Sequence, residues 1–306
     1  MSIARAIDIA YVRMAAPDVE RQVDFLRDFG LIDLGEHGGK RLLCAEDKAP
    51  FCYSLVEGEP GFLGFGLWVA DDAALAALAA HDGSEVRPLD APGGGHYVRM
   101  VDPDGFQIDA VADQSLRDAA VRPPVGWNES GAAHRIDRLR RIDPGPSRVL
   151  RLGHLAMVVS DFIRSETWYK DRFGFLTTDE FELEPGTSAG SFLRTDRGTK
   201  PSDHHTLVLF QSGTEPRLRH LAFEVGDVDD LMAGREHLIK CGHTPHWGVG
   251  RHLLGSQIFD YWFDPYGREH EHWTDGDQLS ANTPPNLVGM DQVMGVQWGM
   301  ERPTRV

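Results

Sequence analysis

The sequence predicts an α+β protein built from tandem βαβββ modules, two in each of two domains. First, a short apolar run followed by an amphipathic segment recurs four times along the chain. Second, strand-like apolar runs follow each amphipathic segment. Third, segment 102–109, which begins Asp-Pro-Asp-Gly, is echoed by segment 264–271 in the second half. Because internal self-similarity reflects repeated structural units, the two halves indicate a duplication.

Each repeat opens on a strand and continues into a helix. The four pairs are 9–14 with a helix ending near 29, 65–69 with 72–80, 153–159 with 161–173, and 219–225 with 228–241. An aspartate near each helix start can accept hydrogen bonds from free backbone amides, and a glycine near three of the helix ends suits a left-handed terminator. The strands expected after the helices include 41–44, 96–101, 205–210 and 257–263.

The domain division follows from composition. Segment 114–150 is rich in Pro, Gly and Arg, which predicts a linker. We therefore expect an N-terminal domain over 1–113 and a C-terminal domain over 151–276, each long enough to bury a core. Residues 277–306 are expected to form a tail that packs on the C-terminal domain.

Composition excludes several classes of function. The net charge of −16 disfavours nucleic acid and anionic membranes as partners. Cys44, Cys52 and Cys241 are odd in number and widely spaced, so they fit a reducing cytoplasm better than a disulfide framework. No signal peptide is expected at the start, and no apolar run has the length of a membrane span. Edge strands and an aromatic-rich tail favour a homo-oligomer.

The candidate metal site centres on Glu271. Segment 264–267 is an expected turn, and Glu271 lies on the strand that follows it. His154 and His220 occupy the opening strands of the third and fourth repeats, so the repeats can bring all three to one place. Two imidazoles and one carboxylate on one face leave open positions on an octahedral metal, an arrangement typical of Fe(II) sites that handle oxygen.

The first half is not expected to bind this metal. Aligning the repeats places Tyr11, a residue near Gly64, and Asp109 at the positions of the two histidines and the glutamate. Two of these three positions cannot supply the same ligands. The sequence therefore predicts a metal site in the C-terminal domain alone.

The second half resembles the catalytic domain of the type I extradiol ring-cleaving dioxygenases, which belong to the vicinal oxygen chelate, or glyoxalase and bleomycin resistance, superfamily. His154, His220 and Glu271 match the family's three ligand positions. The specific motifs cover about 151–275, and 9–111 resembles the family's metal-free first domain more weakly. The resemblance implies that each domain is an incomplete barrel of mixed sheet with flanking helices.

Three more positions match the family in register. His205 lies fifteen residues before His220, His252 ends a Gly-Arg-His element, and Tyr261 follows nine residues later. The resemblance implies that His205 is the acid–base group, while Tyr261 and His252 hold the proton of a substrate hydroxyl. No catalytic role is expected for the remaining candidates, His204, His243, His246, His270 and His272.

The resemblance implies an Fe(II)-dependent extradiol dioxygenase, with Mn(II) as an alternative metal, that opens a substituted catechol beside its diol with O₂ during catabolism of aromatic compounds. Ala156 stands where relatives acting on carboxylate-bearing catechols tend to have asparagine. Leu253 and Leu254 are apolar where several relatives are polar. Both features favour alkyl, aryl or halogen substituents.

Two other kinds of function remain open from the sequence. One keeps the fold but changes the reaction, as in a glyoxalase-like isomerase or lyase, or a hydroquinone-cleaving dioxygenase. An isomerase of that kind usually has a fourth protein ligand, whereas the register gives three. The other is a non-catalytic small-molecule-binding relative, which would have no need of His205, His252 and Tyr261.

Overall fold

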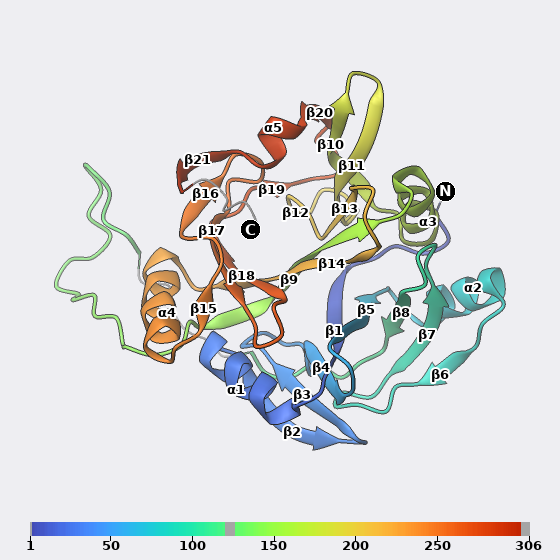
Figure 1. Ribbon diagram of the computed structural model, residues 1–306, viewed down its shortest axis with the longest axis horizontal. Helices are drawn as coiled ribbons and strands as arrows, with labels where there is room; N and C mark the ends of the chain where they lie inside the picture. The colour runs from blue at the N-terminus through green and yellow to red at the C-terminus, as the bar shows by residue number, and fades with distance from the viewer. Residues whose placement is uncertain (1, 120–125, 301–306) are drawn as a thin grey trace.

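The computed structural model describes residues 2–119 and 126–300, and its strands form two large mixed sheets (Figure 1). The strands of the first half make an eight-stranded sheet in the order β2-β3-β4-β1-β5-β8-β7-β6. The second half makes an eleven-stranded sheet in the order β20-β10-β11-β13-β9-β14-β18-β17-β16-β21, with β15 paired to β17. The parts of the expected linker and tail at 120–125 and 301–306 lie outside the described residues.

The elements follow one another as the repeats predict. The first half contains β1 (Asp8–Ala16), α1 (Val19–Phe29), β2 (Ile32–His37), β3 (Lys40–Cys44), β4 (Tyr53–Glu57), β5 (Gly61–Trp68), α2 (Asp72–Asp82), β6 (Val86–Pro88), β7 (His96–Val101) and β8 (Gln107–Ala112). The third repeat contains β9 (Val149–Val159), α3 (Phe162–Phe173), β10 (Leu176–Glu184), β11 (Thr187–Arg194), β12 (Ser202–Asp203) and β13 (Leu207–Gln211). The fourth contains β14 (Arg217–Val225), α4 (Val228–Lys240), β15 (Thr244–Pro245), β16 (Gly250–His252), β17 (Ile258–Phe263) and β18 (Glu269–Thr274).

The predicted α+β class and tandem βαβββ modules are confirmed. Within each repeat the first strand pairs in parallel with the last, as β1 does with β4 and β14 with β18. The first strands of the two repeats in one half pair antiparallel, as β9 does with β14. The fourth repeat adds short strands to the basic unit, and β12 pairs outside the large sheets with β19 (Gln278–Leu279).

The helix ends follow the predicted capping chemistry. In each of the four repeat helices, α1 to α4, the side chain of the N-cap aspartate accepts a hydrogen bond from a backbone amide in the first turn. Three helices end on a glycine in the left-handed conformation, namely Gly30, Gly83 and Gly174. Helix α4 instead ends on a right-handed Cys241, and the positive φ falls one residue later, at Gly242.

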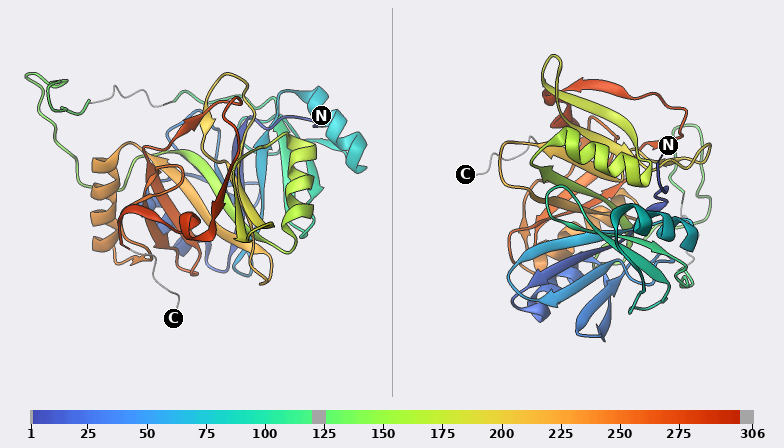
Figure 2. Two further views of the ribbon diagram at one scale, coloured as in Figure 1. Left: turned by 90° about the horizontal axis from the view of Figure 1, so that it is seen from above. Right: turned by 90° about the vertical axis from the view of Figure 1, so that its right-hand side faces the viewer.

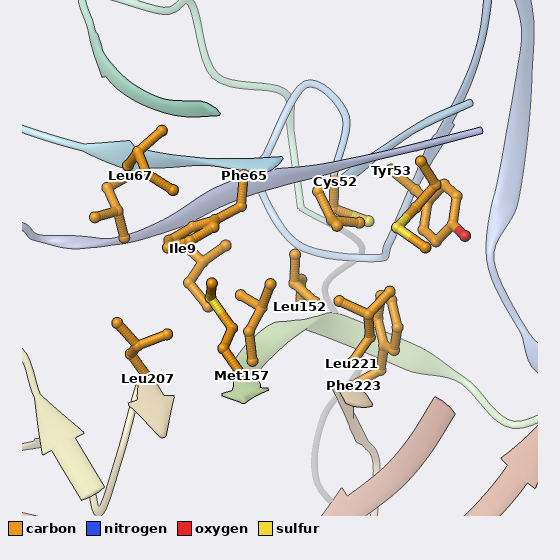
Figure 3. Close-up of a cluster of buried hydrophobic side chains, with 14 of the residues drawn as sticks. Ile9, Cys52, Tyr53, Phe65, Leu67, Leu152, Met157, Leu207, Leu221 and Phe223 are labelled. Atoms are coloured by element: carbon orange, nitrogen blue, oxygen red, sulfur yellow. The ribbon is translucent and has the colours of Figure 1, made fainter. Parts of the chain in front are cut away.

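One hydrophobic core joins the two sheets. Figure 3 shows side chains of the first half, such as Ile9 and Phe65, facing Leu152, Met157 and Leu221 of the second across a common interior. Figure 2 shows α3 and α4 near opposite ends of the second sheet. None of the helices in residues 2–119 and 126–300 has the length and apolar character needed to cross a membrane.

The same core contains two of the histidines for which no catalytic role was expected. His270 and His272 lie on the face of β18 opposite Glu271, and both are fully buried. His272 Nε2 lies 2.7 Å from the backbone oxygen of Phe29, and its ring stacks on the Phe29 ring. Burial lowers the pKa of His272 to about 3, so its imidazole is neutral. These residues pack α1 against the second sheet.

The chain after β18 folds back onto the second sheet. Strand β20 (Asn286–Gly289) pairs in parallel with β10, and β21 (Val296–Gly299) pairs antiparallel with β16. The short helix α5 (Met290–Val293) connects them. The tail thus extends the sheet at both of its edges, and α5 lies near β10 and β20 (Figure 1).

An ion-pair cluster occupies the first half at the place where the second half brings its ligands together. Tyr11 pairs with Gly66 and Gly64 with Gln107, just as His154 pairs with Ala222 and His220 with Glu269. There the Tyr11 hydroxyl donates to Asp109 at 2.9 Å, and Arg99 donates to both Asp109 oxygens at 2.7 and 2.9 Å. Arg13 adds a second cation 3.5 Å away. Two guanidinium groups therefore neutralise the fully buried carboxylate.

Asp109→Asn is expected to destabilise the fold without changing the metal content. Arg13 and Arg99 would lose their common anion, and an uncompensated, partly buried charge costs on the order of 3 kcal/mol. Urea unfolding measures the change. Metal analysis of the folded variant is the control, and loss of metal there would contradict the assignment of metal binding to the second half alone.

Candidate metal centre

Three neighbouring strands bring His154, His220 and Glu271 together. The residues lie on β9, β14 and β18, which are adjacent in the sheet. The His154 Nε2, His220 Nε2 and Glu271 Oε2 atoms form a triangle with all three sides 3.3 Å long. The centre of such a triangle is about 1.9 Å from each corner, and metal–nitrogen and metal–oxygen bonds are roughly 2.0–2.2 Å long. A single cation just off this plane can therefore contact all three atoms.

The charge and burial of these groups also fit a cation. The Glu271 carboxylate is fully buried, and neither of its oxygens has a hydrogen bond from the described residues. Burial alone would raise its pKa, but the imidazoles of His154, His252 and His220 hold the pKa of Glu271 well below its usual range. A buried carboxylate without hydrogen-bond donors is unfavourable unless a cation neutralises it.

The two histidines offer neutral nitrogen ligands. Burial lowers the pKa of His220 to about 3, which leaves an imidazole lone pair free to coordinate. His154 is 1% exposed, and its Nδ1 has no hydrogen-bond partner within the described parts of the chain. Ligating imidazoles usually donate their second N–H to an acceptor, so His154 departs from the common pattern. The His220, His154 and Glu271 donor set suits a divalent transition metal.

His252 and Tyr261 lie together beside this triad. The Tyr261 hydroxyl is 3.1 Å from His252 Nε2, and that nitrogen is 3.5 Å from Glu271 Oε1. Strand β17 places Tyr261 directly opposite Glu271 on β18. Burial, followed by the neighbouring Glu271 carboxylate, raises the pKa of Tyr261 well above its ordinary value. Tyr261 is therefore a neutral phenol beside an imidazole that can exchange a proton with it.

His205 lies next to His154. The two ring centroids are 4.1 Å apart, and Phe192 contacts His205 edge-on at 5.0 Å. His205 lies two residues before the observed start of β13, whereas the sequence predicted it inside that strand. Burial, followed by the neighbouring histidines, lowers the pKa of His205 well below its usual value.

A cavity of about 410 Å³ joins these groups. His154, His205, His220, His252 and Tyr261 all line it. The remaining wall is largely apolar and includes Ala156, Phe181, Phe192, Trp247, Leu254 and Met290. The structure therefore brings every predicted site residue to one cavity or to its edge.

Leu253 was expected to make the pocket apolar together with Leu254, but it does not line the cavity. Leu254 lines the cavity, but Leu253 is 43% exposed and turns away from it. A positive φ at the following glycine, Gly255, turns the chain here.

Some lining residues had no signal in the sequence. Met290 and Val293 come from α5, and they reach the cavity because β20 joins the far edge of the sheet. Phe181 lies on the edge of the same region, on β10. Arg217 and Arg219 add positive charge to the lining, and Arg219 forms an ion pair with Glu269.

A curled mixed sheet of repeated βαβββ units with a His-His-Glu group that could hold a metal ion is the arrangement of the vicinal oxygen chelate type. Residues 151–271 match the family model described as Glyoxalase/Bleomycin resistance protein/Dioxygenase superfamily. The resemblance predicted from the sequence is thus confirmed.

Curated relatives match nearly the whole chain. Metapyrocatechase 2 of Cupriavidus necator is 27% identical over 305 residues, covering 96% of this chain and 89% of the relative. The iron-dependent extradiol dioxygenase of Rhodococcus jostii strain RHA1 is 24% identical, covering 94% of this chain and 98% of the relative.

Solved structures share the fold at lower identity. The 2,3-dioxygenase LapB of Pseudomonas sp. KL28 superimposes with a TM-score of 0.76 at 18% identity, covering 95% of this chain and 99% of that chain. The Mn(II)-bound glyoxalase of Novosphingobium aromaticivorans superimposes with a TM-score of 0.77 at 23% identity, covering 98% of this chain and 93% of that chain. The fold alone is therefore compatible with more than one reaction.

Proposed function

We propose that the protein is an extradiol dioxygenase that cleaves a substituted catechol beside its diol with O₂. The observation that carries this proposal is that His205, in ring contact with His154, and the His252–Tyr261 pair, in contact with Glu271, line the same cavity. Of the two curated relatives matched over nearly their whole length, one is named a metapyrocatechase and the other an iron-dependent extradiol dioxygenase.

His154, His220 and Glu271 would hold the metal, which we propose is Fe(II), with Mn(II) as the alternative. When bound, such a metal supplies Lewis acidity and open positions for a bidentate diol and for oxygen. One carboxylate leaves a divalent ion with a single positive charge, which a singly deprotonated catechol neutralises. The Tyr261 hydroxyl and His252 Nε2 are placed to orient one substrate hydroxyl and to accept its proton.

His205 supplies an imidazole to the side of the cavity next to His154. Its low pKa keeps it neutral near physiological pH, so it can accept a proton and return it to the opened product. Phe192 and the apolar wall exclude water from this side, which favours transfer between His205 and the substrate over exchange with solvent.

The cavity favours catechols with apolar substituents. Phe181, Phe192, Val208 and Phe210 line the region beyond Ala156. Burial of a hydrocarbon substituent against such a wall is favourable, whereas a carboxylate would lose hydration there. We infer that alkyl, aryl or halogen substituents bind better than acidic ones.

A glyoxalase-like isomerase is the second candidate, because the Mn(II)-bound glyoxalase has the same fold. An isomerase of that kind usually has a fourth protein ligand, whereas the donor group here contains three among the described residues. Because the fold is shared, an activity measurement is needed to distinguish a dioxygenase from a glyoxalase-like isomerase.

The test uses protein purified without oxygen and loaded with Fe(II) or Mn(II). We expect 2,3-dihydroxybiphenyl and 4-methylcatechol to give a yellow ring-fission product with one O₂ consumed per ring opened. We expect kcat/KM for these to exceed that for 3,4-dihydroxyphenylacetate by roughly tenfold or more. Binding without oxygen uptake, or isomerisation of a thiol hemiacetal of methylglyoxal, would overturn the dioxygenase assignment.

The compartment and assembly are proposals as well. We infer a cytoplasmic homo-oligomer in which the sequence-based domains, 1–113 and 151–276, belong to one subunit. Light scattering coupled to size-exclusion chromatography measures the subunit number, and a monomer at micromolar concentration would contradict it.

A further inference from the structure

His204 connects the acid–base histidine to a buried carboxylate. His204 Nδ1 lies 3.0 Å from His205 Nδ1, and His204 Nε2 lies 2.7 Å from Asp179 Oδ2. Asp179, His204 and His205 are 4%, 5% and 4% exposed. These three side chains form a continuous row from β10 to the cavity.

Several contacts fix His204 in this position. Its backbone N–H donates to the Asp277 oxygen at 2.9 Å, and its carbonyl accepts from Thr178 Oγ1 at 2.7 Å. Gly255, at φ +76°, lies so close that a Cβ there would be 3.0 Å from His204 Cγ. A side chain at position 255 would thus press on the His204 ring, and glycine leaves room for the ring in this position.

Asp179 is held by its other oxygen. Asn286 Nδ2 on β20 donates to Asp179 Oδ1 at 3.2 Å. Asp179 Oδ2 makes no hydrogen bond among the described residues, and His204 Nε2 lies next to it at an ion-pair distance of 2.7 Å.

The short contacts limit where the protons of these rings can lie. Two lone pairs repel at 2.7 Å, so His204 Nε2 carries a proton on the side of the Asp179 carboxylate. A neutral His204 ring has a lone pair on Nδ1, and in that state the 3.0 Å contact makes His205 Nδ1 the donor. His205 Nε2, the remaining nitrogen of the ring that lines the cavity, is left with a lone pair.

We propose that Asp179 and His204 are positioning residues that hold His205 as the Nδ1–H tautomer, with Nε2 ready to accept the substrate proton. This inference rests on the proposed acid–base role of His205. After Nε2 accepts a proton, His205 carries N–H groups on both nitrogens, and its Nδ1–H still donates to His204. The new positive charge then lies one imidazole away from Asp179, which favours it.

Asp179→Asn tests this proposal with almost no change in shape. Asn286 still donates to the amide oxygen at 179, so the amide NH₂ turns toward His204 Nε2. His204 Nε2 must then accept, its proton moves to Nδ1, and His205 becomes the Nε2–H tautomer. We expect kcat to fall roughly 10²–10⁴-fold, the range of general acid–base effects and of tautomer errors, with KM for the catechol and metal content unchanged.

The exchange variant D179N/N286D provides the matched control. Its carboxylate at 286 accepts from the amide NH₂ at 179, so the amide oxygen again faces His204 and the total charge is unchanged. We expect this double variant to recover most of the lost kcat. A purely structural role for Asp179 predicts no such recovery.

Nitrogen-15 NMR of histidine rings in the metal-free protein reads the tautomer directly, with His205 assigned from the spectrum of His205→Gln. We expect Nδ1–H in the wild type, Nε2–H in Asp179→Asn and Nδ1–H again in the double variant. The same tautomer in all three would overturn the proposal, even if kcat changed. An inactive wild type would refute the proposed function. The NMR pattern would still show, independently of activity, whether Asp179 and His204 set the tautomer of His205.

Discussion

His154→Ala is expected to give a folded protein that no longer retains its metal or its ring-cleaving activity. The substitution removes one corner of a triangle whose sides are all 3.3 Å, and Glu271 with His220 would remain as only two ligands. Even changes to residues behind metal ligands weaken binding by roughly 10–100-fold, so loss of a ligand itself is expected to exceed 100-fold. Metal analysis after dialysis against a chelator, together with O₂ uptake, measures both effects.

Tyr11→Phe is the matched control, because Tyr11 holds the position of His154 in the first half. It removes the hydrogen bond to Asp109, which is expected to lower stability by about 1 kcal/mol or slightly more and to leave metal content unchanged. Full metal content and full turnover in His154→Ala would show that the triad is not the binding site. Circular dichroism of both variants separates metal loss from unfolding.

Local chemistry made much of the fold predictable. The N-cap aspartates and the glycine terminators depend on neighbouring residues only, so the helices fall within a few residues of their predicted ends. Strand alternation correctly separated Glu271 from His270 and His272. Because a duplication repeats its strand register, aligning the halves correctly placed Gly64 at the position in the first half that is equivalent to His220 in the second.

Other features depend on contacts between distant segments and had no local signal. Strand β20 reaches β10 over more than a hundred residues, and this pairing supplies both Met290 to the cavity and Asn286 to Asp179. The contacts of His204 could likewise be predicted only in part from the sequence. Its contact with His205 follows from adjacent positions, but its contact with Asp179 depends on how β10 lies in the folded sheet.

The sequence also did not predict what replaces the metal in the first half. It showed that Tyr11 and Gly64 lack suitable donors, but it did not identify Arg13 and Arg99 as the cations around Asp109. Arg99 lies opposite Asp109 in the same register in which Tyr261 lies opposite Glu271. The pairing of these strands therefore allows either an ion-pair cluster or a metal site, depending on the side chains.

His205→Ala is expected to keep the metal but to slow turnover by roughly 10²–10⁴-fold, the usual contribution of a general acid–base group. None of the three 3.3 Å sides involves His205, so the ligand set remains complete. The loss is expected mainly in kcat, because the apolar wall that contacts the catechol is retained. Stopped-flow mixing of the anaerobic substrate complex with O₂ measures the affected steps separately from substrate binding.

His237→Ala is the control for removal of a histidine away from the cavity. His237 lies on α4, where its Nε2 is 3.2 Å from Asp28 Oδ1, and its substitution is expected to leave turnover unchanged. Loss of metal in His205→Ala would indicate that His205 is a fourth ligand, outside the three-residue donor group, and would favour the glyoxalase-like alternative. A wild-type rate would instead leave His205 as a packing residue between Phe192 and His154. Retained metal with slow oxygen-dependent turnover is the one combination that a proton-transfer role for His205 predicts.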